Sequence, residues 1–217
     1  KFPATPALDA KYDYDVGSRL TLADITAAGG TKLSFTYDNL NRVDTATQTL
    51  GALNPLLLDY AYDKVGNRTQ LKYPSGKIID STYDAHDRLE YIKEGGNNLA
   101  QLAYDPLDRR TGKAYYTTPF QGALYEYDIA NQLKKITNQV IGQSNPLSQF
   151  DYPNYDNVGN RMTMDERRGT QSQRTNYSYN NIYELTSVTG GQLHGYLYDN
   201  VGNRKNADGT SYIANRL

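Results

Sequence analysis

The chain has 217 residues, with 23 basic and 24 acidic side chains, so its formal net charge of −1 gives no global field that favours nucleic acid or an anionic membrane. It has no cysteine, which excludes disulfides, thiolate metal sites and a thiol nucleophile. Only 38% of the residues are hydrophobic, but 21 tyrosines, four phenylalanines and no tryptophan favour strands over disorder. The longest apolar stretch, around Leu56-Leu57-Leu58, is far too short to span a bilayer, so we expect no membrane insertion.

A Tyr-Asp dipeptide recurs along the chain at spacings of 19 to 28 residues, with a mean of 23. Nine aligned copies define an internal repeat, and such repeats are typical of arrays in which each unit packs on the next. The copies are Tyr14-Asp15, Tyr37-Asp38, Tyr62-Asp63, Tyr83-Asp84, Tyr104-Asp105, Tyr127-Asp128, Tyr155-Asp156, Tyr179-Asn180 (a near copy) and Tyr198-Asp199. A tenth, damaged copy begins at Tyr212, where Tyr212–Leu217 resembles Tyr127–Leu133 with the aspartate deleted.

The residues after each Tyr-Asp pair predict a tight turn. Aspartate at the first turn position and Gly, Asn or Asp at the fourth are typical of a type I turn whose fourth residue is a left-handed bulge. The fourth turn residues are Ser18, Asn41, Gly66, Asp87, Asp108, Asn131, Gly159, Tyr183 and Gly202. Tyr183 departs from this preference, and the sequence therefore predicts a distorted turn there.

A second turn signal follows each tyrosine after 11 to 15 residues. These signals are Gly29-Gly30, Gly51, Pro74-Ser75-Gly76, Gly95-Gly96, Thr118-Pro119, Gly142, Gly169, Gly190-Gly191 and Asp208-Gly209. Two turns in about 23 residues leave two strands of about seven residues each, and we expect one strand of each pair to end at the tyrosine. The larger repeat spacings predict longer loops at 142–146 and 50–55.

Aromatic residues alternate before the turns, as in Phe35 and Tyr37 or Tyr60 and Tyr62, which places each pair on one face of a sheet. No stretch has a sustained helical period. The sequence therefore predicts an all-β fold, a single array over residues 1–217 in which antiparallel β-hairpins form a long, spiralling sheet. About 18 strands would make a strip on the order of 85 Å long that must twist.

Three segments resemble the YD repeat of RHS proteins: Tyr62-Asp63-Lys64-Val65-Gly66-Asn67-Arg68, Asp156-Asn157-Val158-Gly159-Asn160-Arg161 and Asp199-Asn200-Val201-Gly202-Asn203-Arg204. That family includes polymorphic-toxin shells, shell components of insecticidal toxin complexes, wall-associated proteins and teneurins. The resemblance covers Tyr12 to Leu217. It implies a spiralling strip of hairpins that closes, in complete members, into a hollow shell around a C-terminal toxin. The core-ending segment that precedes the toxin in those members is absent here, and nine or ten repeats are few for a closed shell.

The repeated residues have competing interpretations. Each aspartate could be a catalytic carboxylate, but repetition in nine turns favours a structural acceptor of backbone hydrogen bonds. Arg19, Arg42, Arg88 and Arg109 could bind acidic ligands, but we expect them to pair with carboxylates of the neighbouring turn while their alkyl stems pack on tyrosine rings. The tyrosine ladder could bind sugars or could join one repeat to the next. His86 and His194 lie in different repeats without metal-ligand spacing.

We therefore expect no catalytic, cofactor or metal site, and a non-enzymatic structural segment of a secreted, extracellular or cell-surface bacterial protein. The expected partners are the remaining repeats of the parent chain, or identical copies joined through end strands. An enclosed toxin domain and glycans are further possible partners. Two alternatives stay open: an extracellular filament built from YD repeats, and a glycan-binding adhesion module.

Overall fold

The computed structural model describes residues 10–25, 30–191 and 194–205. Every regular element among them is a strand. The chain consists of two compact units, Lys1–Gln101 and Leu102–Leu217. The predicted turn at Asp208-Gly209, residue Gly29 and the damaged tenth copy at Tyr212–Leu217 lie outside the described residues.

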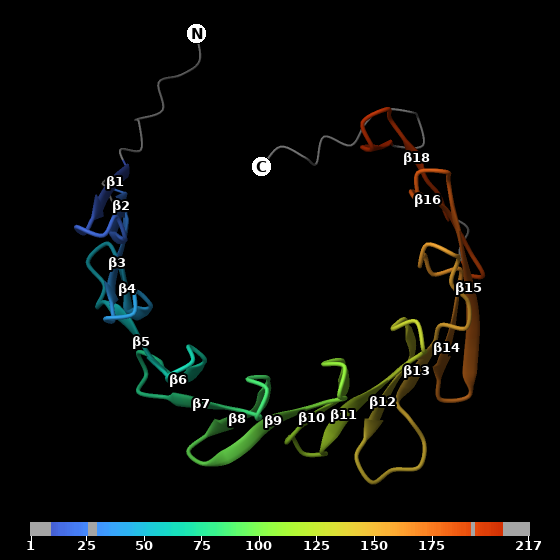
Figure 1. Cartoon of the computed structure of the whole chain (residues 1–217), viewed down its shortest axis with the longest axis horizontal. Helices are drawn as coiled ribbons and strands as arrows, with labels where there is room; N and C mark the ends of the chain where they lie inside the picture. The colour runs from blue at the N-terminus through green and yellow to red at the C-terminus, as the bar shows by residue number, and fades with distance from the viewer. Residues whose placement is uncertain (1–9, 26–29, 192–193, 206–217) are drawn as a thin grey trace. The chain divides into compact units, whose positions relative to one another are not determined.

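The first unit contains eight strands and the start of a ninth (Figure 1). They are β1 (Ala10–Tyr14), β2 (Leu20–Ile25), β3 (Thr31–Tyr37), β4 (Val43–Leu50), β5 (Leu56–Tyr62), β6 (Arg68–Lys72), β7 (Ile78–Tyr83), β8 (Leu89–Glu94) and β9 (Asn97–Tyr104).

The second unit contains the end of β9 and ten further strands. They are β10 (Arg110–Tyr115), β11 (Gln121–Tyr127), β12 (Leu133–Val140), β13 (Ser148–Asp151), β14 (Thr163–Arg168), β15 (Gln171–Tyr179), β16 (Leu185–Thr189), β17 (His194–Gly195), β18 (Leu197–Tyr198) and β19 (Arg204–Lys205).

From β1 to β9 in the first unit and from β10 to β17 in the second, each strand pairs antiparallel with the next, and β18 pairs with β19 in a separate sheet. Among the described strands, substantial contacts join strands that are consecutive in the chain. The predicted all-β hairpin array is confirmed. Because each hairpin packs mainly on its neighbours, stability is approximately a sum of hairpin and nearest-neighbour contributions.

The two faces of the sheet differ in polarity, as the alternation predicts. In the first unit, cross-strand register places Phe35 opposite Ala46 and Ala46 opposite Leu58 on one face. On the other face Thr36 lies opposite Thr45, and their hydroxyls are 2.7 Å apart. Most of the apolar face is half-buried, and among the described residues the buried hydrophobic side chains are those of Ala100, Leu102, Ala123 and Tyr152. The described part of the chain thus has no thick aliphatic core, which agrees with the low hydrophobic content.

Strands end at the tyrosine of the pair in eight of the nine repeats. The prediction is wrong at Tyr155, which forms only an isolated bridge with Arg161, because β13 ends earlier at Asp151. The amide of Tyr152 still bonds the Lys134 carbonyl at 2.9 Å, but Pro153 follows and has no N–H to extend the ladder.

One of the two predicted long loops is present. Residues 141–147 connect β12 to β13, at the sheet edge opposite the Tyr-Asp turns of this unit (Figure 1). The connection at 51–55 is no longer than the one at 73–77. The extra residues of that repeat lie instead in β4 and β5, which are longer than β6.

Candidate functional site: the Tyr-Asp turns and the joints between them

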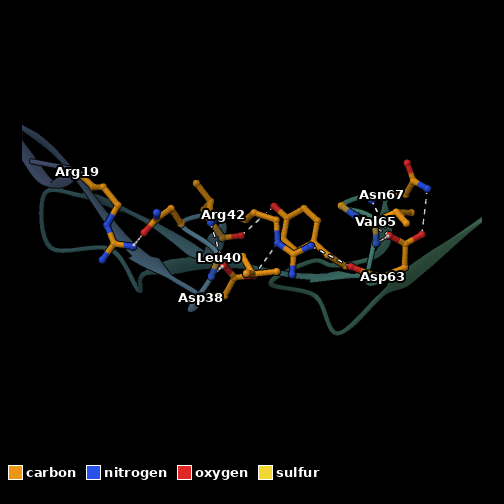
Figure 2. Close-up of polar contacts among 11 residues, drawn as sticks. Arg19, Asp38, Leu40, Arg42, Asp63, Val65 and Asn67 are labelled. Atoms are coloured by element: carbon orange, nitrogen blue, oxygen red, sulfur yellow. Dashed lines mark hydrogen bonds and ion pairs between the residues drawn. The ribbon is translucent and has the colours of Figure 1, made fainter. Parts of the chain in front are cut away.

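Each Tyr-Asp turn is closed by its own backbone, and the turn at Asp38 shows the pattern (Figure 2). The Asn41 N–H donates to the Asp38 carbonyl at 3.1 Å, and the Asp38 N–H donates to the Arg42 carbonyl at 2.9 Å. Asp38 Oδ1 accepts hydrogen bonds from the backbone N–H groups of Leu40 and Arg42 at 2.8 and 2.9 Å. The aspartate is therefore the internal acceptor of the turn, as in an Asx turn.

The fourth residue of all nine turns has a positive φ, between 60° and 105°. Glycine adopts this conformation without cost, and Asn and Asp tolerate it. The predicted distortion at Tyr183 is wrong: with φ 66° its N–H donates to the Asn180 carbonyl at 3.0 Å, as in the other turns. Tyr183 is 58% exposed, so its large side chain is not confined by close packing at this turn.

The turns differ in the side chain that binds the second aspartate oxygen. In the arginine turns, at Asp15, Asp38, Asp84 and Asp105, it is the Nε of the arginine four residues later, at 2.6 to 2.8 Å. In the asparagine turns, at Asp63, Asp156 and Asp199, it is the Nδ2 of the asparagine at the same position, at 2.8 to 3.0 Å. The turn at Asn180 inverts the polarity, since its amide donates to Glu184 at 2.6 Å.

The aspartates of the arginine turns are stabilised as anions. The Arg88 side chain, together with the backbone N–H groups of Arg88 and His86, lowers the pKa of Asp84 to about 2. The pKa values of Asp15 and Asp38 are also lowered, chiefly by the backbone N–H groups of Arg19 and Arg42 and then by the arginine side chains. Carboxylates held in this way are poor general acids and bases near neutral pH.

A tyrosine hydroxyl joins most of the repeats to the repeat before them. In seven repeats it donates to the carbonyl of the fifth residue after the preceding aspartate, or after Asn180 in the last pair, at 2.5 to 3.0 Å. These bonds run from Tyr37 to Leu20, Tyr62 to Val43, Tyr83 to Arg68, Tyr127 to Arg110, Tyr155 to Leu133, Tyr179 to Arg161 and Tyr198 to Leu185. We call this contact the inter-repeat joint.

Arginine adds a second contact to three joints. The guanidinium carbons of Arg19, Arg42 and Arg109 lie 4.7, 4.5 and 4.8 Å from the ring centroids of Tyr37, Tyr62 and Tyr127, the tyrosines of the following repeats. Each guanidinium also reaches the next turn: Arg19 Nη1 bonds Asn41 Oδ1, Arg42 Nη1 bonds the Asp63 carbonyl (Figure 2), and Arg109 Nη1 bonds Asn131 Oδ1.

This arrangement corrects the predicted role of the arginines. Arg19, Arg42, Arg88 and Arg109 pair with the aspartate of their own turn, since a separation of four residues across a tight turn brings the two groups together. At Arg19, Arg42 and Arg109, the guanidinium lies over the next tyrosine, and the neighbouring turn supplies a carbonyl or amide oxygen. The joint itself was missed, because its acceptor is a backbone carbonyl with no sequence signature.

In the asparagine turns, arginine stands one position later in the sequence, and its guanidinium lies near tyrosine rings of the array. Arg161 lies between two rings, 4.8 Å from the centroid of Tyr152 and 5.0 Å from that of Tyr177. Arg204 lies 5.1 Å from the ring of Tyr196. These arginines therefore stack on tyrosines that lie outside the Tyr-Asp pairs.

Metal-ligating side chains do not gather at these turns in the part of the chain that the structure describes. That part contains no group of three or more His, Asp or Glu side chains that could hold a metal ion. His86 is exposed in its turn, and His194 lies in β17 with its ring 6.5 Å from that of Tyr196. Across residues 10–25, 30–191 and 194–205, no helix is long and apolar enough to cross a membrane.

Solved structures of toxin complexes are similar to this chain in fold. The chain superimposes on TcdB2-TccC3 with a TM-score of 0.71, and on TcdB2-TccC3-Cdc42 with 0.68, at 16% identity in each case. It has a TM-score of 0.58 and 13% identity to the Photorhabdus luminescens Tc holotoxin pore. The chain has the RHS/YD-repeat fold. Each comparison covers 90% of this chain and 12 to 14% of the other chain.

The sequence is also similar to a bacterial nuclease. It is 25% identical over 173 residues to the tRNA nuclease WapA of Bacillus subtilis, and equally so to the tRNA3(Ser)-specific nuclease WapA of Bacillus spizizenii. The match covers 76% of this chain but only 6% of each relative. No family model matches the chain.

Proposed function

We propose that residues 1–217 form one array, a non-enzymatic structural segment that serves as a length of β-sheet wall in a larger secreted bacterial YD-repeat protein. The observation that carries the proposal is the inter-repeat joint, in which the same hydroxyl-to-carbonyl bond recurs in seven repeats. Each joint of this kind adds a nearest-neighbour contribution to stability, which favours a continuous, rigid wall.

In this proposal the signature residues are structural. Tyrosines of the pairs join successive repeats, the aspartates and Asn180 hold the turns, and Gly66, Gly159 and Gly202 supply the left-handed turn position. Repetition supports this role, because a catalytic site is a single constellation and not one carboxylate in each of nine turns.

A toxin is the cargo that the comparisons favour. The similar proteins include nucleases and a component of a holotoxin, and this chain matches only a small share of each. We propose that the segment contributes to a shell that encloses a toxin domain outside residues 1–217. The filament remains the alternative within structural proteins, and the sequence that flanks these residues in the parent gene distinguishes the two. A toxin domain downstream selects the shell, and many further repeats select the fibre.

The glycan-binding alternative has less support, because sugars stack on free aromatic faces. Guanidinium groups already lie over Tyr37, Tyr62 and Tyr127. The exposed tyrosines of the described residues are scattered and do not form a continuous row along the sheet. They are Tyr12 and Tyr14 in β1, Tyr73 and Tyr116 in connections, Tyr115 at the end of β10, and Tyr183 in its turn.

Hydrogen exchange on the purified chain tests the wall. We expect slow exchange of the β3 to β16 amides without ligand, no cleavage of added tRNA, and no retention on a glycan panel. Cleavage of tRNA abolished by a single substitution in these residues would overturn the structural assignment. Fast exchange along the ladder, reversed only by a glycan, would instead identify an adhesion module.

A further inference from the structure

Four consecutive Tyr-Asp turns of the second unit carry an exposed aliphatic side chain at the tip. These side chains, which we call the tip row, are Leu107, Ile129, Val158 and Ile182, at the second or third position of their turns, and each is more than half exposed. The turns project from one edge of the sheet (Figure 1). Single exposed hydrophobic residues are ordinary, but recurrence at one place in successive repeats makes a row, and exposed apolar patches mark contact surfaces.

Folding of the turns does not require the tip row. The Leu107 N–H donates to Asp105 Oδ1 at 2.9 Å, and the Val158 N–H donates to Asp156 Oδ1 at 3.0 Å. Any residue other than proline supplies such an N–H, and polar residues or glycine are the usual choice in tight turns. The aliphatic side chains therefore have no role in closing the turns that carry them.

A groove of about 600 Å³ lies between the first two tips of the row. It is lined by Leu107, Arg109, Tyr127, Asp128, Ile129, Asn131 and Lys134. Two of its charges are already engaged, since Arg109 pairs with Asp105 at 2.7 Å and Asp128 accepts N–H groups of its own turn. Lys134 is exposed and has no ion-pair partner among the described residues. The groove thus combines aliphatic side chains with one uncompensated cation.

The chain contains a second joint of this kind with the opposite charge. At the Arg19–Tyr37 joint of the first unit, the guanidinium carbon lies 4.7 Å from the ring centroid, and both neighbouring turn tips carry an exposed aliphatic side chain. The sixth residue after the turn aspartate is Asp44 here, where the groove of the second unit has Lys134, and both are exposed. Charge therefore distinguishes two otherwise similar joints.

We propose that the groove and the tip row bind an acidic peptide in the polyproline II conformation, with an aliphatic side chain at every third residue. Its aliphatic side chains contact successive tips, and a carboxylate beside them pairs with Lys134. The acidic character follows from charge complementarity, because the free charge of the groove is positive. The site goes beyond the proposed function, since a wall needs no ligand at its turns.

The spacing of the tips favours this conformation. Consecutive tips are two strands apart, or about 10 Å at roughly 4.8 Å per strand. A polyproline II helix presents the same face every three residues, about 9.3 Å, so the mismatch over three intervals is only about 1 Å. The seven-residue repeat of an α-helix is about 10.5 Å long, and its mismatch grows to about 3 Å.

A heteronuclear NMR titration of the intact chain tests the proposal, with a synthetic peptide of three Pro-Leu-Glu triplets as the probe. We expect shifts at the amides of Leu107, Ile129 and Lys134, and an affinity that falls as salt is added. Peptides of Pro-Leu-Lys and of Pro-Ser-Glu triplets are the controls, because they reverse the charge or remove the aliphatic groups. Each should bind about tenfold more weakly or less.

Variants of the chain separate the two contributions. Lys134→Asp should weaken binding of the Pro-Leu-Glu peptide about three- to tenfold, and Ile129→Ser should weaken it about as much. Lys64→Asp is the matched control, since it makes the same charge change at an exposed lysine outside the groove, and it should leave the affinity unchanged. Asp44→Lys should add shifts around Leu40, because it gives the first-unit joint the missing cation.

Three results would refute the peptide site: no shifts at millimolar peptide, equal binding of the three peptides, or an affinity that Lys134→Asp leaves unchanged. If the same amides instead shift with protein concentration alone, and Ile129→Ser abolishes that shift, the tip row binds a second copy and the peptide proposal is wrong. The amide exchange of β3 to β16 tests the wall separately, so either result leaves the proposed function standing.

Discussion

Tyr62→Phe isolates the contribution of one inter-repeat joint to stability. The substitution keeps the ring under the Arg42 guanidinium and removes the hydroxyl that donates to the Val43 carbonyl at 2.9 Å. A net intramolecular hydrogen bond contributes about 0.5 to 1.5 kcal/mol, and Val43 is half-buried, so its carbonyl gains only partial hydration in exchange. We expect a loss of about 1 kcal/mol, which corresponds to roughly a fivefold increase in local opening.

Native-state hydrogen exchange of the β4 and β5 amides measures this opening directly, since an array need not unfold in one step. Tyr115→Phe is the control. Tyr115 is 42% exposed, its ring has a contact with Lys113 that phenylalanine keeps, and no acceptor for its hydroxyl is found among the described residues. Equal exchange in the two variants would show that the hydroxyl-to-carbonyl bond does not hold the repeats together.

Three further predictions concern the turns. Lowering the pH from about 4 to about 2 should remove the stability that Asp84 contributes. The pKa of Asp84 is about 2 in the folded protein and below the ordinary 3.8, so the unfolded chain takes up the proton first as the pH falls. Urea titrations across this range should show a shallower pH dependence of the unfolding free energy for Asp84→Asn than for the unchanged protein. Gly159→Ala should destabilise its hairpin by about 1 kcal/mol or more, because φ is 92° there and alanine is strained at a positive φ. Gly195→Ala is the control, since this glycine has an ordinary φ and open space around it. The control should change the denaturation midpoint much less. Tyr183→Asn should raise the midpoint, because asparagine tolerates φ 66° better and the exposed ring loses little packing; an unchanged or lower midpoint would show that the ring stabilises the turn.

The local structure of this protein could be predicted from the sequence because it depends on residues close together in the chain. The Tyr-Asp period predicted the hairpins, and the turn residues predicted a left-handed fourth position, since hydrogen bonds within four residues decide a tight turn. Alternation of period two predicted which side chains share a face. Even Tyr183 occupies the predicted position, although its residue type argued against an ordinary turn.

The tertiary structure decided what joins one repeat to the next. The bond from Tyr62 to Val43 spans 19 residues, and its geometry depends on the bulge that shifts the register between Ala61 and Tyr62. A backbone carbonyl acceptor cannot be recognised in the sequence, because every residue has one. Whether Arg42 pairs with the aspartate of its own turn or with a neighbouring carboxylate depends on distances that only the folded turn fixes. Sequence periodicity thus determined the unit, while strand register determined the joint.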